Sequence, residues 1–198
     1  VNTYAYDPVG NIDYVTMPEG NTINYDYDSA NRLIKITDHL GNYISYSYDS
    51  SGNKIREEIH DNTGTLKKYL DFEYNTYSRL SKIKNPDNSY SAFTYDNNGN
   101  RTEMKTAPGT ISTLYEYDAL NRLKKVISAH GTPDEETTEY QYDRQNNLTQ
   151  IKDAEGKITT YRYDDLERLV ETTSPDTGTT IYTYDAAGNV KTKTDAKG

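Results

Sequence analysis

Short stretches in which apolar and polar residues alternate return along the chain about every 21 residues. Over residues 44–48 an isoleucine and two tyrosines occupy every second position, with serines between them. Residues two apart fall on the same face of a β-strand, so one face of this segment is apolar and the other is polar. The pattern predicts a half-buried strand, and its return predicts a series of such strands.

Each predicted strand ends in the same motif, which is an aromatic residue, any residue, a tyrosine and then an acid or its amide. The second tyrosine advances by 21, 21, 26, 21, 22, 25, 21 and 21 residues, and the motif uses 16 of the 21 tyrosines and both phenylalanines. A fixed period of this kind is the signature of a repeat array. The nine copies are Tyr4/Tyr6/Asp7, Tyr25/Tyr27/Asp28, Tyr46/Tyr48/Asp49, Phe72/Tyr74/Asn75, Phe93/Tyr95/Asp96, Tyr115/Tyr117/Asp118, Tyr140/Tyr142/Asp143, Tyr161/Tyr163/Asp164 and Tyr182/Tyr184/Asp185.

A tight turn and a return strand follow each motif. The acid can accept hydrogen bonds from backbone N–H groups two residues further on, and a nearby glycine supplies the positive φ that the turn needs. The next strand opens with an apolar residue in seven repeats and often carries another one three positions later, as at Leu33 and Ile36. Each repeat is therefore predicted to be a β-hairpin.

The hairpins are predicted to form one array over residues 1–198. Nine hairpins give about 18 short antiparallel strands, and an open sheet of that width cannot stay flat, so we expect it to curl or spiral. Two longer connections, over residues 57–68 and 128–138, are polar and indicate surface loops or strand extensions. The array begins and ends within repeats, so we expect a fragment of a longer repeat protein.

The turns alternate in chemistry along the array. Odd-numbered repeats end the turn in Gly-Asn or Asn-Asn, whereas even-numbered repeats end it in arginine, with another residue in the place of the glycine. Such an arginine can pair with a neighbouring turn aspartate or stack on a tyrosine ring. The alternation indicates a structural unit of two hairpins, of 42 to 47 residues, whose arginines are Arg32, Arg79, Arg122 and Arg168.

Composition narrows the class of protein. Only 33% of residues are hydrophobic, mean hydropathy is −1.00 and tryptophan is absent, which is poor material for a conventional core. Regularly spaced tyrosines still argue against disorder, because each ring buries a large area while its hydroxyl stays hydrated. The net charge of −9 speaks against nucleic acid or an anionic membrane as a partner. No cysteine and no apolar run of membrane-spanning length occur, so we expect neither disulfides nor direct membrane insertion.

The Y-x-Y-D-x-x-G-N/R pattern resembles the YD repeats, or Rhs repeats, of Rhs proteins, bacterial toxin-complex subunits and teneurins. The resemblance covers the whole chain, with nine matches in register. It implies repeats wound into a spiralling β-sheet that forms a hollow shell. In toxin-type members that shell encloses a C-terminal toxic domain, and in teneurins it is part of a cell-surface adhesion receptor. The chain lacks the Rhs core segment with its self-cleaving end, a toxin and a plug domain.

No residue pattern indicates an enzyme. The sequence has no glycine-rich phosphate loop and no Ser/His/Asp arrangement. His39, His60 and His130 lie in separate predicted turns between hairpins with no second ligand nearby, so we expect solvated loop histidines. Paired carboxylates such as Asp164 and Asp165 follow from the repeat and its polar neighbours. We expect no catalytic residue, no cofactor and no metal site.

The aromatic ladder has two interpretations. In the first, tyrosine rings stack on cross-strand neighbours and hold the sheet together. In the second, some rings stay exposed and stack on sugars, although glycan-binding arrays of similar period usually carry tryptophan and adjacent aromatics. The absence of tryptophan and the strict spacing favour the structural interpretation.

These observations predict a structural segment of a YD-repeat shell that encloses or displays a toxin or effector domain of a secreted or cell-surface parent protein. The expected partners are flanking YD repeats and the enclosed domain. The alternative is a cell-surface binding or adhesion module that recognises glycans or a partner protein. The outer strands, at residues 1–6 and near residues 190–194, carry unpaired backbone groups, which predicts edge-to-edge self-association.

Overall fold

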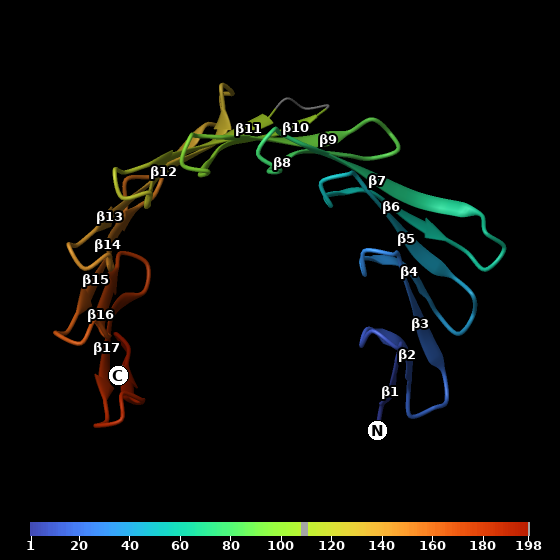
Figure 1. Ribbon diagram of the computed structural model, residues 1–198. Helices are drawn as coiled ribbons and strands as arrows, with labels where there is room; N and C mark the ends of the chain where they lie inside the picture. The colour runs from blue at the N-terminus through green and yellow to red at the C-terminus, as the bar shows by residue number, and fades with distance from the viewer. Residues whose placement is uncertain (108–110, 198) are drawn as a thin grey trace. The chain divides into compact units, whose positions relative to one another are not determined.

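The computed structural model describes residues 1–107 and 111–197, in which every helix or strand is a β-strand (Figure 1). This confirms the predicted all-β class. The strands are β1 (Thr3–Tyr6), β2 (Ile12–Thr16), β3 (Thr22–Tyr27), β4 (Leu33–Thr37), β5 (Tyr43–Tyr48), β6 (Lys54–His60), β7 (Leu66–Tyr74), β8 (Leu80–Lys84), β9 (Tyr90–Tyr95), β10 (Arg101–Ala107), β11 (Ile111–Tyr117), β12 (Leu123–His130), β13 (Glu136–Tyr142), β14 (Leu148–Lys152), β15 (Ile158–Tyr163), β16 (Leu169–Ser174), β17 (Gly178–Tyr184) and β18 (Val190–Thr194).

Contacts divide the described chain into two units, one built from Val1–Phe93 with Thr106 and Ala107, and the other from Thr94–Lys105 and residues 111–197. In the first unit the strands pair antiparallel in chain order from β1 to β9. In the second unit they do so from β11 to β18. Figure 1 shows each unit as a single layer of strands that curves along the chain. Tandem hairpins in a curled antiparallel sheet are thus confirmed within each unit.

Most turns at both ends of the hairpins share one geometry. After β5, the N–H of Asp49 donates to the carbonyl of Asn53 at 2.9 Å, and the N–H of Gly52 donates to the carbonyl of Asp49 at 3.1 Å. Gly52 has a φ of 87°, which closes a three-residue loop with a left-handed last residue. The turn before β5 repeats these bonds: the N–H of Asp38 donates to the carbonyl of Asn42 at 2.9 Å, and the N–H of Gly41 donates to the carbonyl of Asp38 at 3.0 Å.

A β-bulge interrupts the pairing in each Y-D hairpin whose register the structure describes. In the second hairpin Tyr25 pairs with Ile36 and Tyr27 with Leu33, so two residues of the return strand lie opposite Asp26. The extra residue brings Leu33 and Ile36, three positions apart, to the same face. The three-residue spacing seen in the sequence is the mark of this bulge. Register shifts at the same place occur in the other described hairpins.

Burial is shallow throughout the described residues. The only buried large apolar side chains among them are Val15 and Ile127, at 6% and 9% exposure. Most ladder tyrosines are half-buried, whereas Tyr4 and Tyr6 of the outer strand β1 are 54% and 62% exposed. A single-layer sheet has no central core, so its stability comes from contacts between neighbouring hairpins. The described residues include no helix that could cross a membrane.

The face opposite the ladder is aromatic as well as polar in the first unit, which corrects the predicted division of faces. Tyr43 precedes the ladder residue Ile44 in β5 and pairs with His60, so it lies on the opposite face. Tyr14, Tyr69 and Tyr90 are placed in the same way by their registers. These tyrosines stand outside the motif, and the prediction was based on motif positions alone.

The two long connections are strand extensions with a short turn, one of the two predicted forms. β6 continues to His60 and β7 begins at Leu66, so the polar segment adds residues to both strands. β12 likewise continues to His130, and β13 begins at Glu136. The insertions therefore lengthen two hairpin junctions without breaking the order of strands.

Candidate functional site

The motif residues occupy equivalent places in successive hairpins. Their aromatic residues lie at the ends of β1, β3, β5, β7, β9, β11, β13, β15 and β17, and the acid or amide follows directly. The four arginines stand immediately before β4, β8, β12 and β16. The turns and the tyrosine ladder thus form a repeated contact surface between hairpins, which is the candidate functional site.

Each Y-D turn is closed by its acid. Oδ1 of Asp49 accepts hydrogen bonds from the N–H groups of Ser51 and Asn53 at 2.9 and 2.8 Å, and Oδ2 accepts one from Asn53 Nδ2 at 2.9 Å. The bond from the Asn53 side chain is the largest cause that holds the pKa of Asp49 below its ordinary value. The predicted bond to the residue two positions on is confirmed, and a second bond reaches the residue four positions on.

The arginine of even-numbered repeats links two hairpins. Nε of Arg122 donates to Oδ2 of Asp118 in its own turn at 2.7 Å. Nη1 donates to the carbonyl of Asp143 and to Oδ1 of Asn146 in the next turn, both at 3.0 Å, and Cζ lies 4.7 Å from the ring centroid of Tyr142. One side chain therefore stacks on a tyrosine ring as expected, whereas its ion pair is with the aspartate of its own turn and it meets Asp143 of the next turn through the backbone carbonyl. Arg32 over Tyr48 and Arg168 over Tyr184 repeat the stacking, at 4.7 and 4.6 Å.

The asparagine of odd-numbered repeats links forward by a different contact. Nδ2 of Asn100 donates to Oδ2 of Asp96 at 2.9 Å and to Oδ1 of Asn121 in the next turn at 2.8 Å. Asn121 stands where four of the five odd repeats have glycine, and its φ is 61°. A side chain at positive φ is strained, but here it supplies the acceptor that glycine lacks. Asn53 bonds to Ser78 at 3.2 Å and Asn11 to Asn31 at 3.4 Å in the same way.

The second tyrosine of the motif ties its strand to the preceding hairpin. The hydroxyl of Tyr48 donates to the carbonyl of Leu33, which opens the preceding return strand, at 2.7 Å. The predictions from the sequence did not include this contact, although the sequence carries one signal of it: the second aromatic is tyrosine in all nine repeats, while the first is twice phenylalanine. Equivalent bonds join Tyr74 to Lys54 (2.9 Å), Tyr117 to Arg101 (3.0 Å), Tyr142 to Leu123 (2.9 Å) and Tyr184 to Leu169 (2.7 Å).

Cations cover further ladder rings. Nζ of Lys54 lies 4.7 Å from the ring centroid of Phe72, and Cζ of Arg101 lies 4.8 Å from that of Tyr115. A cation over an aromatic face is attracted by the ring quadrupole and occupies the surface on which a sugar would stack. These contacts support the structural interpretation of the ladder.

His60 is the last residue of β6 and is largely covered, which corrects the predicted solvated loop histidine. Its side chain is 13% exposed, and its ring stacks on Tyr43 with centroids 4.5 Å apart and planes inclined by 9°. Nε2 lies 3.2 Å from Oε2 of Glu58, and Nδ1 lies 3.2 Å from the carbonyl of Gly64. The strand extension is the physical reason, since it brings His60 into register with Tyr43.

The other two histidines lie in different hairpin junctions. His39 is exposed in its turn, and His130, at 45% exposure, contacts Glu135 at 2.8 Å. No group of three or more His, Cys, Asp or Glu side chains that could hold a metal occurs within the described ranges. Metal binding therefore gains no support from the arrangement of these side chains.

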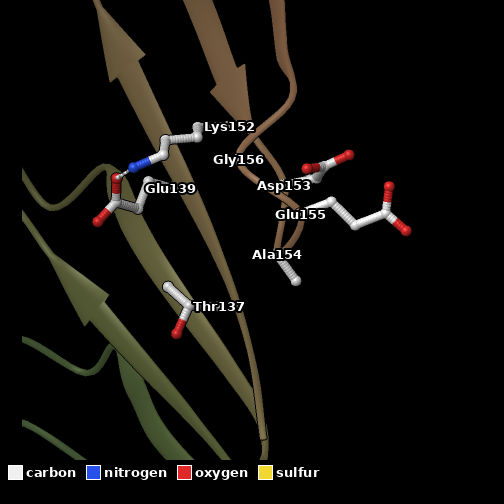
Figure 2. A pocket seen from close by; sticks show the side chains of 7 residues that line it. All are labelled: Thr137, Glu139, Lys152, Asp153, Ala154, Glu155 and Gly156. Carbon is white, nitrogen blue, oxygen red and sulfur yellow. Dashed lines mark ion pairs between the residues drawn. The ribbon is translucent and has the colours of Figure 1, made fainter. Parts of the chain in front are cut away.

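A shallow cleft of about 300 Å³ lies between β13 and the turn after β14, and it is lined by Thr137, Glu139, Lys152, Asp153, Ala154, Glu155 and Gly156 (Figure 2). Oε2 of Glu139 is 3.7 Å from Nζ of Lys152. Figure 2 shows the carboxylates of Asp153 and Glu155 pointing away from this pair. Acidic groups that point apart form neither a cation cage nor an acid–base pair.

Hairpins of one geometry, joined by contacts between neighbouring turns and rings, define a tandem β-hairpin repeat protein. The chain belongs to the RHS repeat family. The pattern of that family, described as RHS Repeat, matches residues 27–66, 129–158, 142–179 and 163–198, which together make up more than half of the chain. The recognition of YD repeats from the motif is thereby confirmed.

Two crystal structures share the fold. The one described as TcdB2-TccC3-TEV has a TM-score of 0.63 at 17% identity, over 98% of this chain and 12% of that chain. TcdB2-TccC3 without hypervariable C-terminal region has a TM-score of 0.61 at 16% identity, over 98% of this chain and 13% of that chain. The chain thus spans a small part of the structures it matches. A comparison with curated proteins found no match.

Proposed function

We propose that the chain is a non-catalytic structural segment of a YD-repeat shell, which encloses or displays a toxin or effector domain of its parent protein. The observation that carries this proposal is the set of contacts between successive hairpins. Arginine, asparagine and tyrosine side chains at the turns are directed to the next or the preceding hairpin, and several ladder rings are covered by cations of the same sheet. Side chains that contact neighbouring hairpins in this way hold successive hairpins together, as the wall of a shell requires.

The similar crystal structures support the proposed role of the parent. Both contain TccC3, and one is described as lacking a hypervariable C-terminal region. A repeat fold combined with a variable region is what a container for different cargoes requires. We propose that residues 1–198 act as one array of nine hairpins, that flanking YD repeats and the enclosed domain are its partners, and that the parent is secreted or at the cell surface.

Protease protection in the full-length parent tests the shell role. The domain downstream of the repeats should resist digestion in the native parent and be digested when expressed alone. Replacing the ladder residues Tyr142 and Tyr184 by alanine should open the wall and speed digestion of that domain. Tyr14→Ala, off the ladder and 40% exposed, is the matched control and should leave protection unchanged. Equal digestion of the domain in the native parent and in isolation would overturn the proposal.

A glycan-binding or adhesion module remains the second candidate function, with a narrower basis. The most exposed ring among the described tyrosines is that of Tyr77, which is 77% exposed in its turn and has Cζ of Arg79 5.3 Å from its centroid. Tyr77→Ala should abolish a signal on a glycan array if this candidate function is correct. A native chain that gives no signal on the array would leave the shell segment as the better assignment.

A further inference from the structure

The outer edge of the first hairpin presents one half of an interface that is complete elsewhere in the chain. Tyr6 is the second tyrosine of its motif, the place held by Tyr48, Tyr142 and Tyr184 in later odd-numbered hairpins. Those three rings are half-buried, and each lies beneath an arginine of the preceding hairpin. Tyr6 is 62% exposed, and among the described residues it has neither a covering cation nor a hydroxyl acceptor.

The complete interface has a fixed composition. An Arg-type hairpin, defined here as one whose Y-D turn ends in arginine, precedes an Asn-type hairpin, whose turn ends in asparagine. At the three such junctions within the units, Cζ lies 4.6–4.7 Å from the ring centroid. At the same junctions the tyrosine hydroxyl donates to the preceding return strand at 2.7–2.9 Å.

The receiving turn also leaves space for the arginine. A Cβ built on Gly52 would lie 4.0 Å from Nη1 of Arg32, and a Cβ on Gly188, in the turn that receives Arg168, or on Gly10 of the first hairpin would meet nothing within 4 Å. Gly10 has a φ of 96°, close to the 87° of Gly52, so the two turns have the same shape. The first hairpin therefore offers the ring, the turn and the empty space, and lacks the cation.

We infer that the outer edge of β1 is a docking surface selective for an Arg-type YD hairpin, and that an Asn-type hairpin binds it more weakly. The observation behind this selectivity is the continuity of the edge with three complete internal interfaces of the same chemistry. The inference rests on the proposed shell role for its partner, a flanking YD repeat. It also qualifies the predicted edge-to-edge self-association, because the hairpin that contains β18 is Asn-type, with Asn189 at the end of its turn.

The full chain itself supplies the test. Asn189→Arg converts the last hairpin to the Arg type, so that β18 of one copy can meet β1 of another with the arginine over Tyr6. We expect self-association, measured by sedimentation velocity over a wide range of concentration, to be about tenfold tighter than in the native chain. A second variant, Gly188→Asn with Asn189→Arg, copies the Asn121–Arg122 pair and serves if the single substitution perturbs the turn.

Two controls separate the proposed contact from a change in charge. Asn189→Lys adds the same charge without a planar group and should associate like the native chain. Tyr6→Leu in the Asn189→Arg background removes the ring and should abolish the gain. Native self-association as tight as that of both arginine variants, or a lysine variant as tight as the arginine variant, would overturn the inference. Neither result would affect the shell proposal, because protection of the downstream domain is measured in the native parent.

Discussion

The acid of each Y-D turn fixes the backbone of the turn with a single side chain. Asp49 does so through three hydrogen bonds, two to N–H groups and one to the side chain of Asn53. Asn75, the one amide at this position, keeps the two backbone bonds, each at 3.0 Å. Accepting hydrogen bonds from backbone N–H groups is therefore the property that all nine residues share, and the other eight carry a negative charge in addition.

Substitution of Asp49 tests this division. Asp49→Ala removes all three bonds and should lower the melting temperature by about 2–4 °C, as expected for the loss of about one net hydrogen bond in a protein of this size. Asp49→Asn keeps an acceptor in place, as Asn75 does, and should cost less. Thermal unfolding followed by circular dichroism measures both, and an alanine variant that melts with the native chain would contradict the role of the carboxylate.

The charge makes stability depend on pH. The largest cause that lowers the pKa of Asp49 is the bond from the Asn53 side chain, and at Asp118 it is the bond from the Arg122 guanidinium. The unfolded chain takes up protons near the ordinary value of 3.8, before the folded chain does. The stabilisation is therefore complete above that value and is lost as pH falls through the lowered values. We expect a melting temperature that is flat from about pH 5 to 8 and falls below about pH 4. A drop that begins well above pH 5 would contradict this role of the turn aspartates.

The hairpin is the element that the sequence predicts best, and its junctions are what the sequence predicts least. Strand alternation and the Asp-x-x-Gly turn are local, so each hairpin could be read from its own residues. The bulge was visible only as the spacing of Leu33 and Ile36, which needs a register before it has a meaning. The hydroxyl bond from Tyr48 to Leu33 joins two hairpins, and no local pattern encodes such a register. His60 was misplaced for the same reason, because its partner Tyr43 lies on another strand.

The tyrosine hydroxyl should contribute only where a preceding hairpin supplies the acceptor. Tyr48→Phe removes the bond to the carbonyl of Leu33 and should lower the free energy of unfolding by about 1 kcal/mol. Tyr6→Phe, at the equivalent place on the open edge, should change it by much less. Chemical denaturation of both variants measures the difference, and equal effects would show that the hydroxyl acts through solvation alone.

At the positive-φ positions of even-numbered turns, the effect of a glycine substitution on stability should depend on whether the native side chain accepts a hydrogen bond. Glu167 has a φ of 60°, and its side chain has no hydrogen-bond partner among the described residues. Glu167→Gly should relieve strain and raise the free energy of unfolding by about 0.5–1 kcal/mol. Asn121→Gly relieves similar strain but leaves Asn98 and Asn100 without their acceptor, so it should bring no gain. Equal stabilisation by the two glycines would contradict the role of the link.

Across the whole molecule, stability is a sum of neighbour contacts. With Val15 and Ile127 as the buried large apolar residues among those described, no hairpin has a distant partner in a shared core. A quasi-one-dimensional array opens from its ends, because an outer hairpin has one neighbour and an inner hairpin has two. The exposed rings of β1 and the fully exposed pattern of β18 agree with this expectation.

Hydrogen exchange measures the gradient. Amides of β1 and β2 should exchange faster than those of β5 and β6 in the first unit, and amides of β17 and β18 faster than those of β13 and β14 in the second. Protection that is uniform within each unit would show instead that the hairpins unfold together.

The alternation of arginine and asparagine turns limits how such an array can change in length. Deleting one internal hairpin places two hairpins of the same turn type side by side, so the alternating contact between their turns is lost at that junction. Deleting two neighbouring hairpins keeps the alternation of arginine and asparagine turns. Duplicating one hairpin likewise breaks the alternation, and duplicating two neighbouring hairpins keeps it. The array should therefore lengthen or shorten in steps of two hairpins. The gain or loss of a single hairpin should persist only where other contacts stabilise the junction between two hairpins of the same turn type.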